Sequence, residues 1–167
     1  MIDQLLEAAT RAPSSHNSQP WRFAVITTSD VKAQLAERMG ERLKADRLQA
    51  ADRIELIDRD VARSRERITS APVVIIVCAA FDGEDAYERV MAIQSVAASI
   101  ENLLLAAHEA GLGACWMAAP LYCPDVAREV LRLPDDWEAQ ALITLGYPAD
   151  EGKSKGRMDF RQITIWR

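Results

Sequence analysis

The spacing of apolar residues along the chain predicts alternating helices and strands. Apolar positions recur every three or four residues, the spacing of a helix with one buried face, in the segments 2–11, 29–39, 90–110 and 124–131. Ser29 is a suitable N-cap for the second of these helices, and Pro124 lies near the start of the fourth, where a helix tolerates proline. Gly111 and Gly113 follow the third helix and are expected to end it.

Runs of β-branched and aromatic residues predict strands over 21–27, 72–79, 114–117, 139–145 and 162–166. The run PVVIIVCA over 72–79 has almost no polar alternation, which is typical of a strand buried on both faces. We therefore expect it at the centre of a sheet. Strands separated by helices favour an α/β or α+β sandwich.

One segment, 41–67, differs because it carries eight basic and seven acidic residues with only scattered apolar ones. This composition predicts a solvated helical excursion with salt bridges along its surface. A lid over a substrate site is the alternative for the same segment.

Composition limits the class of protein. With 167 residues, 49% hydrophobic and 27% charged, the chain is expected to form one folded domain over 1–167. The 20 basic and 25 acidic residues give a net charge of −5, which provides no basic surface for nucleic acid or an anionic membrane. Polar residues from Gln94 to Asn102 argue against a membrane span. The first residues lack the apolar core of a signal peptide, so we expect a cytoplasmic protein.

Side chains suited to catalysis are scarce. Cys78, Cys115 and Cys123 form no CxxC pair, and the chain has only two histidines, so neither a disulfide framework nor a Cys/His metal site is expected. His108 lies within a predicted helix, where a structural role is favoured, and the acids around Trp137 are assigned no catalytic role. No nucleophile, metalloprotease or phosphate-loop motif is present. We therefore assign no catalytic residue and no metal ligand.

One loop, 11–21, is dense in polar side chains. Its amides and hydroxyls lie within six residues, between two prolines: Ser14, Ser15, Asn17, Ser18 and Gln19. Such side chains bind polar ligands, and they also bond the backbone of their own turn. The residues alone leave both interpretations open.

The loop sequence RAPSSHNSQPWRF resembles the signature of the FMN-dependent nitroreductase family, whose common form is APS-x-x-N-x-QPW-x-F. The segments NLLLAAHEAGLGACWM and LGYPAD and a basic tail agree in order and spacing, so the resemblance covers residues 5–167. The middle and end of the chain are similar to the nitroreductase-like domain fused to coenzyme F420 glutamyl ligase, a narrower match on softer motifs. The resemblance implies an α+β sandwich with a mixed central sheet. It also implies bound FMN and hydride transfer from NAD(P)H, or a related donor, to a small acceptor such as a nitroaromatic or a quinone.

The resemblance further implies that FMN binds between the subunits of a homodimer. The loop of one subunit would contact FMN held mainly by the other, whose segment starting at Met117 passes the flavin ring and offers a backbone N–H to flavin N5. A basic tail that includes Lys153 would supply cations to the phosphate. The cofactor-binding residues expected on this basis are Pro13, Ser14, Ser15, Asn17, Gln19, Ala118, Ala119, Pro120, Lys155 and Arg157.

Members of this family usually begin with an Arg-rich element, RRSxRxF, that binds the phosphate, and the present chain starts after it. We therefore expect Arg157 to be the main phosphate cation, with Lys153 and Lys155 more solvated. Residues 162–166 are expected to form a strand that the two subunits exchange. A reductase in coenzyme F420 biosynthesis and a flavin-binding protein without turnover are the alternatives.

Overall fold

The computed structural model describes residues 1–50, 53–81, 85–150, 152 and 155–167. Its strands are β1 (Trp21–Ile26), β2 (Val73–Ala80), β3 (Gly113–Met117) and β4 (Trp137–Gly146). Its helices are α1 (Ile2–Thr10), α2 (Ser29–Gln49), α3 (Ile54–Ser70), α4 (Ala86–Glu109), α5 (Ala119–Tyr122) and α6 (Pro124–Leu131). Two short 3-10 helices are η1 (Ser15–Asn17) and η2 (Phe160–Gln162).

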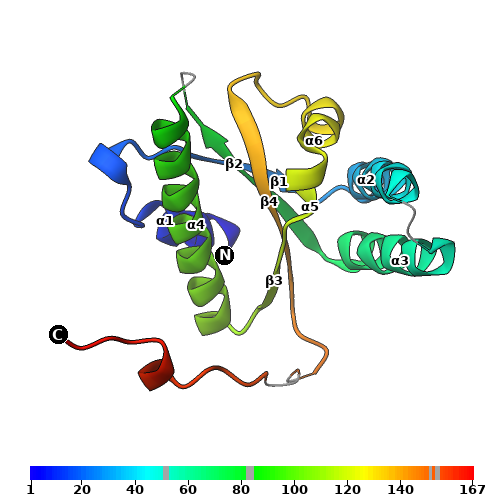
Figure 1. The fold of residues 1–167 in the computed structure, drawn as a ribbon. Helices are drawn as coiled ribbons and strands as arrows, with labels where there is room; N and C mark the ends of the chain where they lie inside the picture. Colours follow the sequence, from blue (N-terminus) through cyan, green and yellow to red (C-terminus); the bar gives the residue numbers. More distant parts are fainter. Residues whose placement is uncertain (51–52, 82–84, 151, 153–154) are drawn as a thin grey trace.

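The strands form one sheet in the order β1-β2-β4-β3, with helices on both faces (Figure 1). Helices α1 and α4 pack on one side, which we call the α4 face. Helices α2, α5 and α6 pack on the other side, the α2 face, and α3 lies alongside α2. The predicted α+β sandwich is thereby confirmed.

Strand β2 lies in the interior of the sheet, as its sequence predicts. Ile75 and Val77 are buried in the core of the α4 face, whereas Val74 and Ile76 are buried in that of the α2 face. Helices cover both faces of the strand, so a polar side chain on either face would be buried, and the sequence therefore shows no polar alternation.

The sheet differs from the expected mixed one, because every neighbouring pair of strands in the described residues is antiparallel. Helices α2 and α3 connect β1 to β2. The second helix runs back alongside the first, so β2 starts at the same end of the sheet at which β1 ends. Strand β2 therefore runs opposite to β1. The single helix α4 crosses over between β2 and β3, but β4 separates these two strands.

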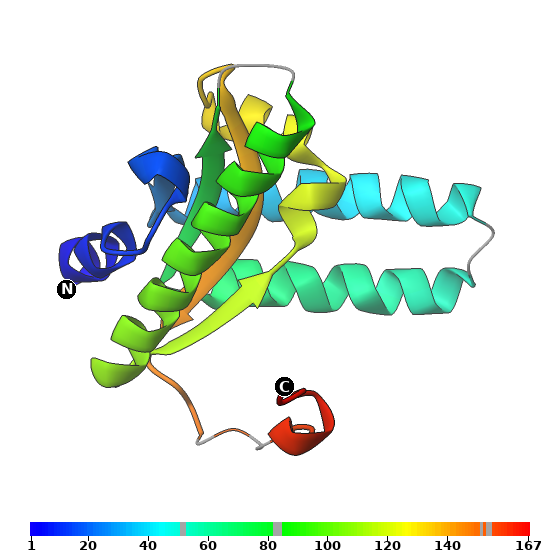
Figure 2. The same ribbon diagram turned by 60° about the vertical axis from the view of Figure 1, so that its left-hand side comes forward.

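The described residues of the charged segment are mostly helical, as predicted, and form much of an antiparallel α2–α3 hairpin that projects beyond the sheet (Figure 2). Lys44 pairs with Asp58 and Arg47 with Asp60, both at 2.7 Å, so ion pairs link the two helices. Helix α2 continues ten residues past its predicted end. Its N-cap is Thr28, so the expected Ser29 cap is wrong.

Helix α4 begins four residues before its predicted start. The Asp85 carboxylate accepts hydrogen bonds from the N–H groups of Tyr87 at 2.7 Å and Glu88 at 3.3 Å, which caps the helix. Gly111, with a φ of 73°, follows the C-cap as expected. Gly113 is the first residue of β3, so its predicted capping role is wrong.

Within the described residues, α4 is the helix long and apolar enough to cross a membrane, since an 18-residue window of it has a mean hydropathy of 1.5. Its Val96, Ile100 and Leu103 are at most 1% exposed and pack in the core of the α4 face. We therefore interpret it as a core helix.

The chain after β4 leaves the body of the protein (Figure 1). The strand predicted over 162–166 does not form here: η2 ends at Gln162, and no regular structure follows. In the described chain the tail pairs with neither edge strand, so its backbone groups lack the ladder partners that a strand needs. Ile165 and Trp166 are 78% and 83% exposed.

Candidate functional site

The polar loop between α1 and β1 has a strained backbone. His16, Asn17 and Gln19 have φ angles of 50°, 57° and 47°, and they are three of the four non-glycine residues with positive φ in the described chain. Each such residue costs on the order of 1–3 kcal/mol, less for Asn, and persists only where its surroundings hold it. Strain of this kind concentrates at ligand sites and switch regions.

Hydrogen bonds within the loop hold this shape. The Gln19 N–H donates to Ser14 Oγ at 3.1 Å, and the Gln19 side-chain amide donates to Asn17 Oδ1 at 3.2 Å. The Ser18 N–H donates to the Ser15 carbonyl at 2.9 Å. The structure thus brings the predicted residues Ser14, Asn17 and Gln19 together. Some of their hydrogen-bonding groups are used within the turn itself.

The loop is also attached to α4 through Ser15. Its N–H donates to Ser95 Oγ at 3.2 Å, and its hydroxyl donates to Met91 Sδ at 3.1 Å. Ser95 is only 5% exposed and donates its own hydroxyl to the Met91 carbonyl at 2.7 Å. Two residues of a core helix therefore contact the strained segment directly.

A cavity of about 480 Å³ opens beside the loop, which is within the range that holds small-molecule ligands. It lies where the loop meets the start of β1, the end of β2 and the first turns of α4. Its lining comprises Ser15, His16, Ser18, Pro20, Arg22, Ala80, Phe81, Glu88, Met91, Ala92 and Asp136. Pro13 and Asn17 are exposed on the loop and do not contribute to this lining.

The cavity combines charged and apolar surfaces. The Arg22 guanidinium donates through Nη1 to the carbonyls of Gln19 at 3.1 Å and Trp21 at 2.9 Å, so it is fixed against the loop. Two carboxylates, of Glu88 and Asp136, also line the cavity. Phe81 and Met91 supply apolar area, so the cavity suits a ring with a polar edge.

The second predicted segment lies at the junction of β3 and α5. Met117 ends the strand, Ala118 is the N-cap of α5, and Ala119 and Pro120 form its first turn. Ala118 is exposed and Ala119 half-buried. Because these side chains are small, a flat ligand could approach the backbone closely.

The two predicted segments lie on opposite faces of the sheet. Ala12 and Trp21, which flank the loop, are buried in the core of the α4 face. Met117 and Ala119 pack against the core of the α2 face. The four-stranded sheet separates the segments, so one chain does not bring them into a common site (Figure 1).

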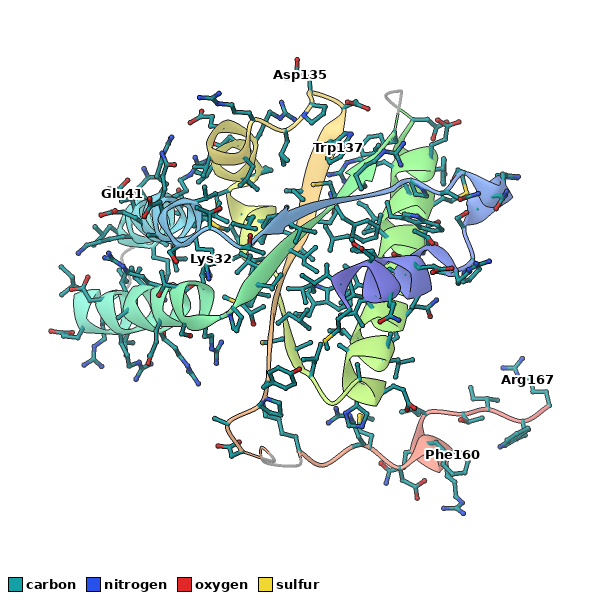
Figure 3. The ribbon with its side chains drawn as sticks, turned by 180° about the vertical axis from the view of Figure 1, so that it is seen from behind. Lys32, Glu41, Asp135, Trp137, Phe160 and Arg167 are labelled. Atoms are coloured by element: carbon teal, nitrogen blue, oxygen red, sulfur yellow. The ribbon has the colours of Figure 1, made fainter. Side chains whose placement is uncertain are left out.

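The part of the tail that carries Lys155 and Arg157 lies apart from both segments (Figure 1). Arg157 is exposed on the tail and donates to the carbonyls of Lys155 at 3.1 Å and Gly156 at 3.2 Å. Lys153 lies outside the described residues. Figure 3 shows the tail with Phe160 and Arg167 extending away from the helices.

Two cysteine thiols are unsuited to nucleophilic chemistry. Burial raises the pKa of Cys78 to about 12. Burial, together with the nearby Asp125 carboxylate, raises the pKa of Cys123 to about 11. Both thiols are therefore protonated near neutral pH, and Cys123 donates to the Ala119 carbonyl at 3.3 Å.

The family profile described as "Nitroreductase family" matches residues 1–147. The chain belongs to this family. An NADH dehydrogenase from Thermus thermophilus is 30% identical over 199 residues, which covers 100% of this chain and 85% of the relative. The protein is accordingly an oxidoreductase.

Solved structures share the nitroreductase fold. A BluB-like flavoprotein from Clostridium difficile 630 superposes with a TM-score of 0.79 at 24% identity, over 99% of this chain and 88% of the other. An FMN-dependent nitroreductase from Clostridium difficile R20291 gives a TM-score of 0.69 at 22% identity, over 98% and 85%. These likenesses support the architecture of sheet and helices described above.

Nitroreductases usually bind a flavin, and the residues present fit one. A flavin ring is flat, with carbonyl and nitrogen acceptors along one edge. The cavity beside the loop offers a hydroxyl donor from Ser18 and guanidinium N–H groups from Arg22. The β3–α5 junction offers backbone next to small side chains at Ala118 and Ala119.

Three residues at this site, Arg22, Ser95 and Asp136, are not among those that the sequence predicts. Asp136 is one of the acids around Trp137 to which the sequence assigns no catalytic role, yet it lines the cavity. Arg22 lies directly after the QPW motif, and its place in that motif was the available signal. Ser95 belongs to the polar residues between Gln94 and Asn102 that argue against a membrane span, and its small side chain also suits close packing of another helix. Its helical spacing to the buried Ala92 and Ser99 could have placed it on the buried face.

Proposed function

We propose that this nitroreductase is an FMN-dependent oxidoreductase that takes hydride from NAD(P)H and passes it to a small organic acceptor such as a nitroaromatic or a quinone. The observation that carries the proposal is the strained loop around Asn17, fixed on α4 and bordering a cavity with donors for a polar ring edge. The family and the relative named NADH dehydrogenase support the reaction class.

We propose further that the working form is a cytoplasmic homodimer. The loop and the β3–α5 junction lie on opposite faces of one sheet, so a second copy is needed to bring one of each together. Apolar side chains support such an interface, since Val90 and Leu105 on α4 are 51% and 59% exposed. Ile165 and Trp166 in the tail are more exposed still and suit the proposed exchange of a C-terminal strand.

Each set of residues has a defined task in this proposal. Bound FMN supplies the hydride chemistry, so no protein nucleophile is required. The loop residues Pro13 to Gln19 hold the flavin by hydrogen bonds and contact. The backbone from Ala118 to Pro120 would lie against the ring, and an N–H of Ala118 or Ala119 would donate to N5, since Pro120 has no N–H. Arg157, with Lys155, neutralises the phosphate through charge-assisted hydrogen bonds.

The test is a spectrum of the purified protein, followed by denaturation to release and identify any flavin. Under anaerobic conditions the bound flavin should then be bleached by NADH or NADPH and restored by a nitroaromatic or a quinone. Bleaching followed by restoration only with an F420 precursor would favour a role in deazaflavin biosynthesis. Flavin that neither nicotinamide bleaches would contradict the proposed donor and favour a flavin-binding protein without turnover.

A further inference from the structure

We infer that Ser95 of α4 is a positioning residue that fixes the strained loop on the core helix and thereby sets the affinity for flavin. The inference rests on the proposed function for the flavin, but the contact itself is a property of the chain. Ser95 does not line the cavity, so it acts through Ser15 rather than on a ligand.

The hydroxyl of Ser95 is committed in two directions. Its proton goes to the carbonyl of Met91, four residues earlier, at 2.7 Å. An oxygen lone pair is therefore left to accept, and it receives the Ser15 N–H at 3.2 Å. Because Ser95 is 5% exposed, water offers little competition for this bond.

The loop depends on this contact because its other hydrogen bonds are mostly local. Bonds among Ser14, Asn17 and Gln19 preserve the turn but do not fix its position relative to α4. In the part of the chain that the structure describes, the hydrogen bonds from η1 to α4 both start at Ser15. Strained φ angles persist only where the surroundings determine them, so loss of the anchor should let the loop relax.

The chain supplies a matched control one turn further along the same helix. Ser99 is 0% exposed, and its Oγ has no hydrogen-bond partner among the described residues. Ser95→Ala and Ser99→Ala therefore delete the same atom from the same buried helix face, but only the first removes an anchor of the loop. Ser95→Thr keeps the hydroxyl and serves as the rescue variant.

Three quantities are measured for the wild type and the variants: the FMN dissociation constant from flavin fluorescence, the apoprotein melting temperature, and the hydrogen-exchange rate of the Ser15 amide. We expect Ser95→Ala to raise the dissociation constant about tenfold, since a neutral hydrogen bond to a preorganised loop is lost. The Ser15 amide should exchange faster in the same variant. Ser99→Ala should leave both values near those of the wild type, and Ser95→Thr should restore them.

Unchanged Ser15 exchange in Ser95→Ala would overturn the inference. Equal loss of flavin affinity and melting temperature in Ser95→Ala and Ser99→Ala would also overturn it, because only packing would then be involved. If the wild type bound no FMN, the proposed function would fail together with the flavin part of the inference. The exchange rate of Ser15 would still report on the anchor.

Discussion

Lys32 should stabilise the fold more than its surface counterparts do. It lies on the side of α2 that faces α3 (Figure 3), and it is only 5% exposed. Its Nζ donates to the carbonyl of Ala71 at 2.6 Å and, more weakly, to that of Pro72 at 3.3 Å. These carbonyls follow the C-terminus of α3, where the helix dipole favours a cation.

The change Lys32→Met keeps the aliphatic stem and removes the ammonium. A hydrogen bond to a charged group contributes about 1.5–3 kcal/mol, and a cation at a helix end about 0.3–1 kcal/mol. Part of this is offset because a buried ammonium no longer has to lose its hydration. We predict a net loss of about 2 kcal/mol, which lowers the urea midpoint by about 1 M for a protein of this size with an unchanged slope.

Lys44→Met is the matched control, since Lys44 is on the same helix and pairs with Asp58 at 2.7 Å, but with both side chains about half exposed. Exposed pairs contribute only about 0–1 kcal/mol, so its midpoint should move little. Equal effects of the two substitutions in urea unfolding would refute the reasoning, because burial would then confer no advantage on the Lys32 contacts.

Three further predictions concern the cofactor and acid stability. Asn17→Gly removes the side-chain amide, and glycine adopts a φ of 57° without strain, so the variant should raise the FMN dissociation constant with little change in the apoprotein melting temperature. An unchanged dissociation constant would show that the amide forms hydrogen bonds only within its own turn. Arg157→Gln should weaken binding of FMN more than of riboflavin, which lacks the phosphate, and equal weakening would place Arg157 away from it. A hydrogen bond from Arg42 holds the pKa of Asp125 below its usual range. The pairing therefore stabilises the fold fully at a pH above the unfolded pKa of about 4, and this stabilisation is lost as the pH falls through the lower folded pKa. Asp125→Asn should therefore flatten the acid limb of the stability curve, and superimposable curves for variant and wild type would contradict this assignment.

Much of the fold could be predicted because local pattern and burial agree. The run over 72–79 is apolar throughout, since β2 is covered on both faces, and the segment 124–131 has both helical spacing and a proline at its start. Strand direction was harder to predict. It depends on whether one helix or two connect the strands, and the charged segment did not reveal that it folds back as a hairpin.

The tail shows why alternating apolar residues do not suffice to make a strand. Residues 162–166 have strand-like composition, but a strand forms only where a sheet edge supplies backbone partners, and none pairs with them in the described chain. The exchanged strand therefore stays a prediction about the dimer.

The candidate site was predictable only in part, for a related reason. The polar loop was conspicuous in the sequence, but its attachment to Ser95 and the placement of Asp136 beside it depend on contacts between distant segments. The positive φ angle of Gln19 could likewise not be predicted, since glutamine does not favour this conformation as glycine, asparagine and histidine do.

The most direct test of the shared flavin site is sedimentation equilibrium of the FMN-loaded protein, followed at a wavelength that only the flavin absorbs. The mass of one chain is 18.6 kDa. We predict that the flavin sediments with a species of twice that mass, because the loop around Asn17 and the junction at Ala118 can meet only across a dimer. Flavin bound stoichiometrically to a monomer of 18.6 kDa would contradict this account.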